Sequence, residues 1–226
     1  MIGYFSRRIK AYSMLFGFVT CAALTPSISA AETAKDDAKT ALNPLFFYYY
    51  NGELVGNRSF SVSDPDNWGG VQAKNLTATS TGSKVSISPT NYRGEGDAIL
   101  VEWSRKKKKG QLTLGGGAPV DISAAKDAAA LTFDIRIDTM SKKPVMVGMD
   151  CDHPCRAELN ISKQLRSYPK KEWFTFPIPL NCFTSDDFDL SKITGPLMLS
   201  TEGKMTAAIA NVRLERLPPG ETGCAE

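Results

Sequence analysis

The sequence predicts an all-β protein, an antiparallel β-sandwich with little helix. Short runs in which apolar and polar residues alternate recur along the chain, as in 131–138 and 145–149. Clusters of Gly, Pro, Asn and Asp separate these runs and are typical of tight turns. Helical periodicity is almost absent, and the chain has no internal repeat. Short strands joined by frequent turns are the pattern of a sandwich.

The first thirty residues are typical of a secretory signal peptide. Arg7, Arg8 and Lys10 are basic, residues 14–24 form a short apolar run, and small residues follow up to Ala30. The apolar run is shorter than the roughly 20 residues that a membrane span needs. We therefore expect cleavage after Ala30 or the next alanine. The product would be a periplasmic or secreted protein without a membrane span.

A flexible linker is expected at 31–44, one β-sandwich domain at 45–217 and a C-terminal tail at 218–226. The first strand is rich in aromatic residues and is followed by an Asn51-Gly52 turn signal. The expected strands lie at 45–50, 60–63, 85–87, 98–103, 111–114, 131–138, 145–149, 173–180, 197–200 and 207–214.

The segments between these strands have distinct compositions. Residues 64–70 are dense in turn formers and predict a loop, and residues 124–130 predict a single helical turn. The basic run at 105–109 is more typical of a solvated hairpin tip than of a polyanion site. The whole chain has 226 residues and a formal net charge of +3. So small a charge does not indicate a nucleic-acid partner, and none is expected.

Four cysteines follow the leader, and exported proteins usually oxidise such residues. The preferred disulfide joins Cys151 and Cys155, because the chain already turns between them. Cys182 could pair with Cys224 or stay free. A metal site built from Cys151, His153 and Cys155 is disfavoured, because a structural zinc usually takes its four ligands from two separated pairs.

Several motifs occur in an order that resembles one known family. Gly94-Glu95-Gly96-Asp97-Ala98 precedes Trp103, Pro119-Val120-Asp121-Ile122 follows, and a strand then ends in Arg136-x-Asp138. Met149-x-Cys151, Trp173, Ile178-Pro179-Leu180, Cys182-Phe183, Gly195-Pro196-Leu197 and Asn211-Val212-Arg213-Leu214 complete the series. This order is similar to the galactose-binding-like domain at the C-terminus of bacterial exo-β-glucanases of glycoside hydrolase family 3, the ExoP-type domain.

The resemblance implies a jelly-roll, galactose-binding-like sandwich that is not catalytic by itself, because the nucleophile and the acid of that family lie on other domains. The implied function is a secreted carbohydrate-binding or glycosidase-accessory domain for a β-glucan-like polysaccharide or oligosaccharide. A glycoside hydrolase would be a possible partner. A structural cell-envelope protein without sugar affinity and a small glycoside hydrolase are the alternatives.

Sugar rings bind to aromatic platforms flanked by hydrogen-bonding side chains. Trp68 lies in the polar segment 64–70, and Tyr92 stands between Asn91 and Arg93, so these four residues are the candidate binding site. Trp103 and Trp173 lie on expected strands and are assigned to the core. No cofactor is expected, although Asp64, Asp66 and Asp97 are the residue type that holds structural Ca²⁺.

Overall fold

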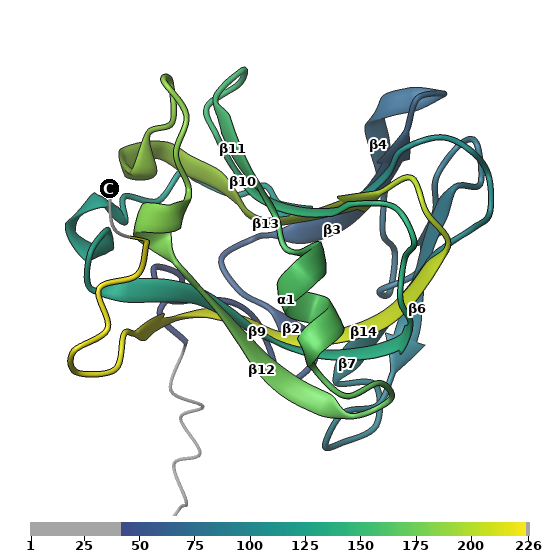
Figure 1. The fold of residues 1–226 in the computed structure, drawn as a ribbon. Helices are drawn as coiled ribbons and strands as arrows, with labels where there is room; N and C mark the ends of the chain where they lie inside the picture. The colour runs from purple at the N-terminus through teal and green to yellow at the C-terminus, as the bar shows by residue number, and fades with distance from the viewer. Residues whose placement is uncertain (1–41, 225–226) are drawn as a thin grey trace, which may run out of the picture. The chain divides into compact units, whose positions relative to one another are not determined.

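The computed structural model describes residues 42–224 and contains two antiparallel sheets that pack as a sandwich (Figure 1). The expected leader and most of the expected linker lie outside the described residues. The eight-stranded sheet has the order β12 (Trp173–Pro179), β9 (Ala129–Thr139), β14 (Met205–Arg216), β7 (Ala98–Trp103), β6 (Val85–Thr90) and β5 (Ala78–Thr79). It also contains β1 (Phe47–Tyr50), paired with β14 and with β2 (Glu53–Leu54).

The six-stranded sheet has the order β11 (Arg156–Asn160), β10 (Val145–Cys151), β13 (Ile193–Thr201), β8 (Gly110–Gly115), β3 (Ser59–Asp64) and β4 (Asn67–Gln72). Helical segments are short: α1 (Ser162–Ser167) and the 3-10 turns η1 (Ser123–Ala125), η2 (Leu180–Cys182) and η3 (Leu190–Lys192). The all-β sandwich predicted from alternation is therefore confirmed. No helix within 42–224 has the length and apolarity of a membrane span.

The core lies between the two sheets and follows the alternation of the strands. Leu131, Phe133, Ile135 and Ile137 on β9 are buried and meet inward residues of the other sheet in one cluster. Trp103 is core as expected, with 2% of its surface exposed, and its indole N–H donates to the Gly110 carbonyl at 3.0 Å. Burying such apolar surface is the main stabilising contribution to a sandwich of this size.

One prediction about local structure is wrong, and one short helix was not predicted. Residues 64–70 form a loop only at their start, because β4 begins at Asn67 and carries Trp68. The strand is largely exposed and pairs only with β3 at the sheet edge, so no alternating apolar pattern marks it. The helix α1 was not expected because it is one short element with a single buried apolar residue, Leu165.

A buried lysine ties together the loops at one end of the sandwich. Lys84 is 0% exposed, and its Nζ donates to the carbonyls of Ser104 at 2.7 Å and Lys106 at 3.0 Å. It also donates to the carbonyls of Glu202 at 3.0 Å and Gly203 at 3.1 Å. A buried ammonium is tolerable only when hydrogen bonds replace its hydration. The loops that follow β7 and β13 are therefore held in place by one side chain.

Candidate functional site

An aromatic and charged surface lies on the outer face of the eight-stranded sheet. The register pairs Trp173 of β12 with Arg136 of β9, while Phe174 pairs with the buried Ile135. Side chains alternate along a strand, so Trp173 and Arg136 point away from the core. The Arg136 guanidinium lies 5.3 Å from the centroid of the Trp173 ring. It also makes a two-bond contact with Asp138, at 2.9 and 3.0 Å.

The assignment of Trp173 to the core is therefore wrong. The residue is half-buried, and it lies on the side of β12 that also carries the exposed Thr175 and Pro177. Residues on both faces of β12 are apolar near Trp173, so the sequence of this strand does not show which face points into the core. The pairing with β9 decides the matter, because β9 has one clearly polar face.

Tyr92 belongs to the same surface. Its ring packs edge-on against Trp173, with centroids 4.6 Å apart. The strands β9, β14 and β7 lie between β12 and β6 in the sheet, so the loop after β6 folds back across the outer face. Ala98, Ala208 and Ala210 on the strands beneath this loop are fully buried. Their short side chains leave room for the loop to lie close to the sheet. We call Tyr92, Trp173, Arg136 and Asp138 the outer-face cluster.

A carboxylate holds the loop that carries Tyr92. Asp97 accepts hydrogen bonds from the backbone N–H groups of Tyr92 at 2.6 Å, Arg93 at 2.9 Å and Gly94 at 2.7 Å. Burial by itself would raise the pKa of Asp97, but these hydrogen bonds outweigh burial and lower the pKa. The charged form of Asp97 is therefore the one that organises the loop.

The other two residues predicted beside Tyr92 are exposed. Asn91 accepts a hydrogen bond from the N–H of Gly96 at 2.9 Å and so helps to shape the loop. The Arg93 guanidinium lies 4.9 Å from the centroid of the Tyr92 ring. Both residues thus lie at the edge of the outer-face cluster. Trp173, Arg136 and Asp138 were not among the predicted site residues, and only their strand pairing shows that they meet Tyr92.

Trp68 lies on the other sheet. It is 54% exposed on β4, at the edge of the six-stranded sheet. In the described part of the chain its ring is not paired with another aromatic ring, whereas Tyr92 contacts Trp173. The structure therefore does not bring Trp68 and Tyr92 together, and any sugar contact at Trp68 would be a separate one.

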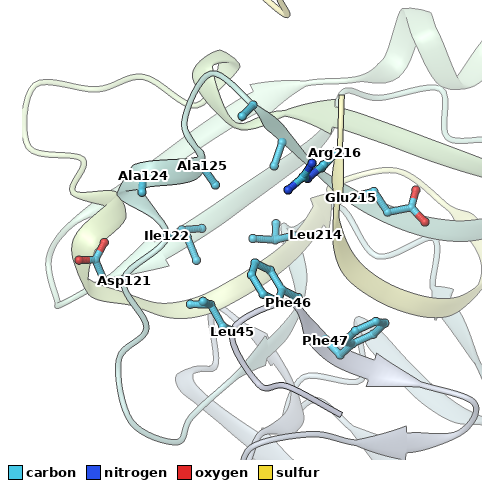
Figure 2. Close-up of a pocket in the computed structure, with 12 residues that line it drawn as sticks. Leu45, Phe46, Phe47, Asp121, Ile122, Ala124, Ala125, Leu214, Glu215 and Arg216 are labelled. Carbon is cyan, nitrogen blue, oxygen red and sulfur yellow. The ribbon is translucent and has the colours of Figure 1, made fainter. Parts of the chain in front are cut away.

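A third surface is an apolar hollow of about 570 Å³ beside β1 (Figure 2). Phe46, Ile122 and Leu214 lie toward one another in it, and alanines of the η1 region complete its wall. The charged groups of Asp121 and Glu215 point away from its centre. Of the labelled charged residues, Arg216 alone turns its charged group toward the hollow. A sugar site needs several polar groups that converge on hydroxyls, so this hollow fits a glycan poorly.

The three aspartates considered for structural Ca²⁺ do not form one site. Asp64 and Asp66 adjoin the turn between β3 and β4, whereas Asp97 precedes β7 and binds the Tyr92 loop. The Lys108 ammonium lies 2.7 Å from an oxygen of Asp66. No group of three possible metal ligands is found among residues 42–224.

Both disulfides considered from the sequence are present. Cys151 joins Cys155, as preferred, and Cys182 joins Cys224, so the alternative with a free Cys182 does not hold. The second bridge fastens the C-terminal tail beside η2. Bonded thiols cannot serve as metal ligands, which also excludes the alternative with His153.

Comparison with known proteins places this arrangement in context. The family described as galactose-binding domain-like, Exop_C, matches residues 59–214. The extra C-terminal domain of an exo-1,3/1,4-β-glucanase from a Pseudoalteromonas species is similar in structure, with a TM-score of 0.64 and 20% identity. The match covers 80% of this chain and 99% of that domain.

Two further structures extend the comparison. The whole Pseudoalteromonas glucanase matches with a TM-score of 0.64 and 21% identity, over 77% of this chain and 21% of that one. This chain therefore spans about a fifth of that enzyme. The family 30 carbohydrate-binding module of a Clostridium thermocellum cellulosomal cellulase matches with a TM-score of 0.53 and 16% identity, over 76% and 96% of the two chains. No curated protein matches.

Proposed function

This chain belongs to the Exop_C family of galactose-binding domain-like proteins, and we propose that it is an exported carbohydrate-binding domain without catalytic activity of its own. Its fold is that of carbohydrate-binding modules, as the family 30 module illustrates. The observation that carries the proposal is the outer-face cluster, in which two aromatic rings and a fixed ion pair are displayed on one sheet surface.

The chemistry of the cluster suits a sugar ring. The C–H face of a pyranose packs on the faces and edges of aromatic rings, here those of Trp173 and Tyr92. The neighbouring Arg136 and Asp138 provide a donor and an acceptor for adjacent hydroxyls, and their mutual hydrogen bonds hold them in place. Such preorganisation reduces the entropy lost on binding.

The name of one similar enzyme supports a class of glycan. The Pseudoalteromonas enzyme is named for its action on 1,3/1,4-β-glucans, so we propose a β-glucan-like polysaccharide as the ligand. A small exposed platform should bind weakly, with Kd on the order of 10 µM to 1 mM. A glycoside hydrolase is a fitting partner, because a weak binding domain would keep such an enzyme near its substrate.

The shifted pKa values of two buried or half-buried carboxyl groups fit a structural role for them and not that of a general acid. A glycosidase needs a general acid whose pKa is raised. The pKa values of Asp64 and Asp97 are lowered instead, because hydrogen bonds to each carboxylate outweigh the effect of burial. Two disulfides fit an oxidising location outside the cytoplasm.

Calorimetry of the purified protein with soluble mixed-linkage β-glucan, alongside an assay for reducing sugar, tests the proposal. We expect saturable binding and no release of reducing ends. Trp173→Ala should remove the binding, while Leu54→Ala, which changes an exposed apolar residue on the short strand β2, should not. Release of reducing sugar by the pure protein, or no binding to any glucan, would overturn the proposal.

A further inference from the structure

The loops at the two ends of the sandwich carry charges of opposite sign. Thr201 pairs with Val145 and with Gly110, and Met205 pairs with Trp103. The loops after β7, β9 and β13 therefore share one end, on the right in Figure 1. We call this the basic end, because these loops contain the runs 105–109 and 142–143 together with Lys204.

The loops at the opposite end are mostly acidic. They lie between β8 and β9 and between β12 and β13, and their acidic residues are Asp121, Asp127, Asp186, Asp187 and Asp189. The small net charge of the whole chain, +3, therefore conceals an uneven distribution of charge between these two sets of loops. A small net charge does not exclude a local field strong enough to attract a polyanion.

The basic end contains a hollow of about 570 Å³. Glu202 is its acidic residue, and its cationic lining is Arg105, Lys107, Lys142, Lys143 and Lys204. All five cationic residues are exposed. Within the described part of the chain, none of their charged groups makes an ion pair or a side-chain hydrogen bond.

The neighbouring lysines differ from these five. Lys106 donates to the Gly82 carbonyl at 2.7 Å, Lys108 pairs with Asp66 at 2.7 Å, and Lys109 pairs with Glu158 at 3.5 Å. The run at 105–109 is thus anchored through these three lysines, while Arg105 and Lys107 remain available. The prediction of a solvated hairpin tip therefore describes only Arg105 and Lys107, and not the whole run.

The loops around the hollow are held in place. Lys84 fixes the carbonyls of Ser104 and Gly203 from within. The hydroxyl of Ser141 donates to the Lys143 carbonyl at 2.8 Å, and that of Thr201 donates to the Pro144 carbonyl at 2.7 Å. A ligand would therefore order only the long side chains and not the loops, which lowers the entropic cost of binding.

The cationic surface is longer than one hollow. A second hollow shares Met140 and Lys142 with the first and adds Arg166 and Lys170. A single small anion would use one of these hollows, whereas a chain with repeated negative groups could contact both. We call the two hollows together the cationic track, and its length favours a polymeric ligand.

We propose that the basic end binds an anionic polysaccharide, with carboxylate or sulfate groups along its chain. The inference rests on the proposed function for the class of ligand, but it uses a surface separate from the outer-face cluster. No aromatic side chain lines the first hollow, and Tyr168 in the second is already stacked on Phe174, with ring centroids 4.0 Å apart. The surface therefore lacks the free stacking platform typical of single-stranded nucleic-acid sites.

The test uses the exported protein and a panel of probes at low ionic strength. Polygalacturonate carries carboxylates, dextran sulfate carries sulfate esters, and mixed-linkage β-glucan is neutral. Duplex DNA and phosphatidylglycerol vesicles are the other polyanions. We expect both acidic polysaccharides to bind, with affinity that falls steeply between about 50 and about 500 mM NaCl as the charges are screened. The stronger of the two identifies the anionic group.

The variants are matched in charge. Lys142→Glu with Lys143→Glu should weaken acidic-polysaccharide binding about tenfold or more, because opposite charges at the track are replaced by like charges. Lys74→Glu with Lys126→Glu makes the same change in net charge on exposed loops outside the basic end and should alter binding less than about twofold. Since all four side chains are exposed, both proteins should fold.

The outcomes separate the two proposals. Loss of polyanion binding in the basic-end variant, with neutral-glucan binding unchanged, supports this inference. Equal losses in both double variants would overturn it, as would no binding to either acidic polysaccharide. Tighter binding to DNA or to vesicles would overturn the assignment to a glycan. The proposed function is tested separately by Trp173→Ala with neutral glucan.

Discussion

The ring of Tyr92 packs edge-on against the ring of Trp173, with centroids 4.6 Å apart. Residues far apart in the sequence thus form one displayed aromatic surface, flanked by the ion pair between Arg136 and Asp138. Neither the alternation of residues around Trp173 nor the composition of the loop around Tyr92 predicts this contact. Because of this contact, Trp173 is a binding residue in our proposal. We expect it to contribute less to the free energy of unfolding than the buried Trp103 does.

Trp173→Ala should lower the free energy of unfolding by only about 1 kcal/mol, the size of an exposed aromatic pair contribution. The buried control, Trp103→Ala, should cost about 3–5 kcal/mol, as large-to-small core changes do. Chemical denaturation of both variants measures the difference. An equal loss in the two proteins would show that Trp173 is structural.

Trp68→Ala should leave stability within about 0.5 kcal/mol of the wild type, because the residue is exposed at a sheet edge. Glycan titration of the same variant then shows whether this second platform contributes to binding. The sequence-based expectation of one joint site predicts loss of all binding. The separate positions of Trp68 and Tyr92 instead predict that the outer-face cluster still binds.

Asp97→Asn should weaken glucan binding, because the amide cannot accept three backbone hydrogen bonds as strongly as a carboxylate does. The pKa of Asp97 is lowered in the folded protein. Its contribution to stability is therefore present above the ordinary Asp pKa of about 3.9 and is lost as pH falls through the lower folded value. Wild-type binding should persist down to about pH 4, and the Tyr92 signals in NMR spectra should shift only below it.

Lys84→Met should destabilise the protein by about 3 kcal/mol or more, since four buried carbonyls would lose their donor. Lys74→Met, at an exposed lysine, is the matched control. Thermal unfolding followed by circular dichroism compares the two. An unchanged midpoint for Lys84→Met would mean that the basic-end loops do not depend on the ammonium.

The two disulfides should differ in their contribution to stability. The bridge from Cys182 to Cys224 spans 42 residues, and the bridge from Cys151 to Cys155 spans 4. In the chain-entropy description, the longer loop is worth about 4 kcal/mol and the shorter about 2 kcal/mol. Replacing both cysteines of each bridge by serine, and comparing denaturation midpoints, measures this order. The reverse order would indicate that the C-terminal tail contributes little to folding.

The sequence by itself determined the architecture of the described domain. Alternation along 131–138 and 145–149 depends only on the two-residue period of a strand, so it specifies strands wherever one face is buried. The order of the family motifs and the pairing of Cys151 with Cys155 were likewise predicted from the sequence. Strands such as β4 were missed because an exposed edge strand needs no alternating pattern.

Only the tertiary structure decided which surfaces could bind. The direction of Trp173 depends on its register with β9, and its contact with Tyr92 depends on a loop that crosses three strands. The basic end likewise exists because antiparallel strands return loops from distant parts of the chain to the same edge. Sequence patterns report local periodicity, whereas such surfaces arise from long-range pairing, which brings together residues that no local pattern connects.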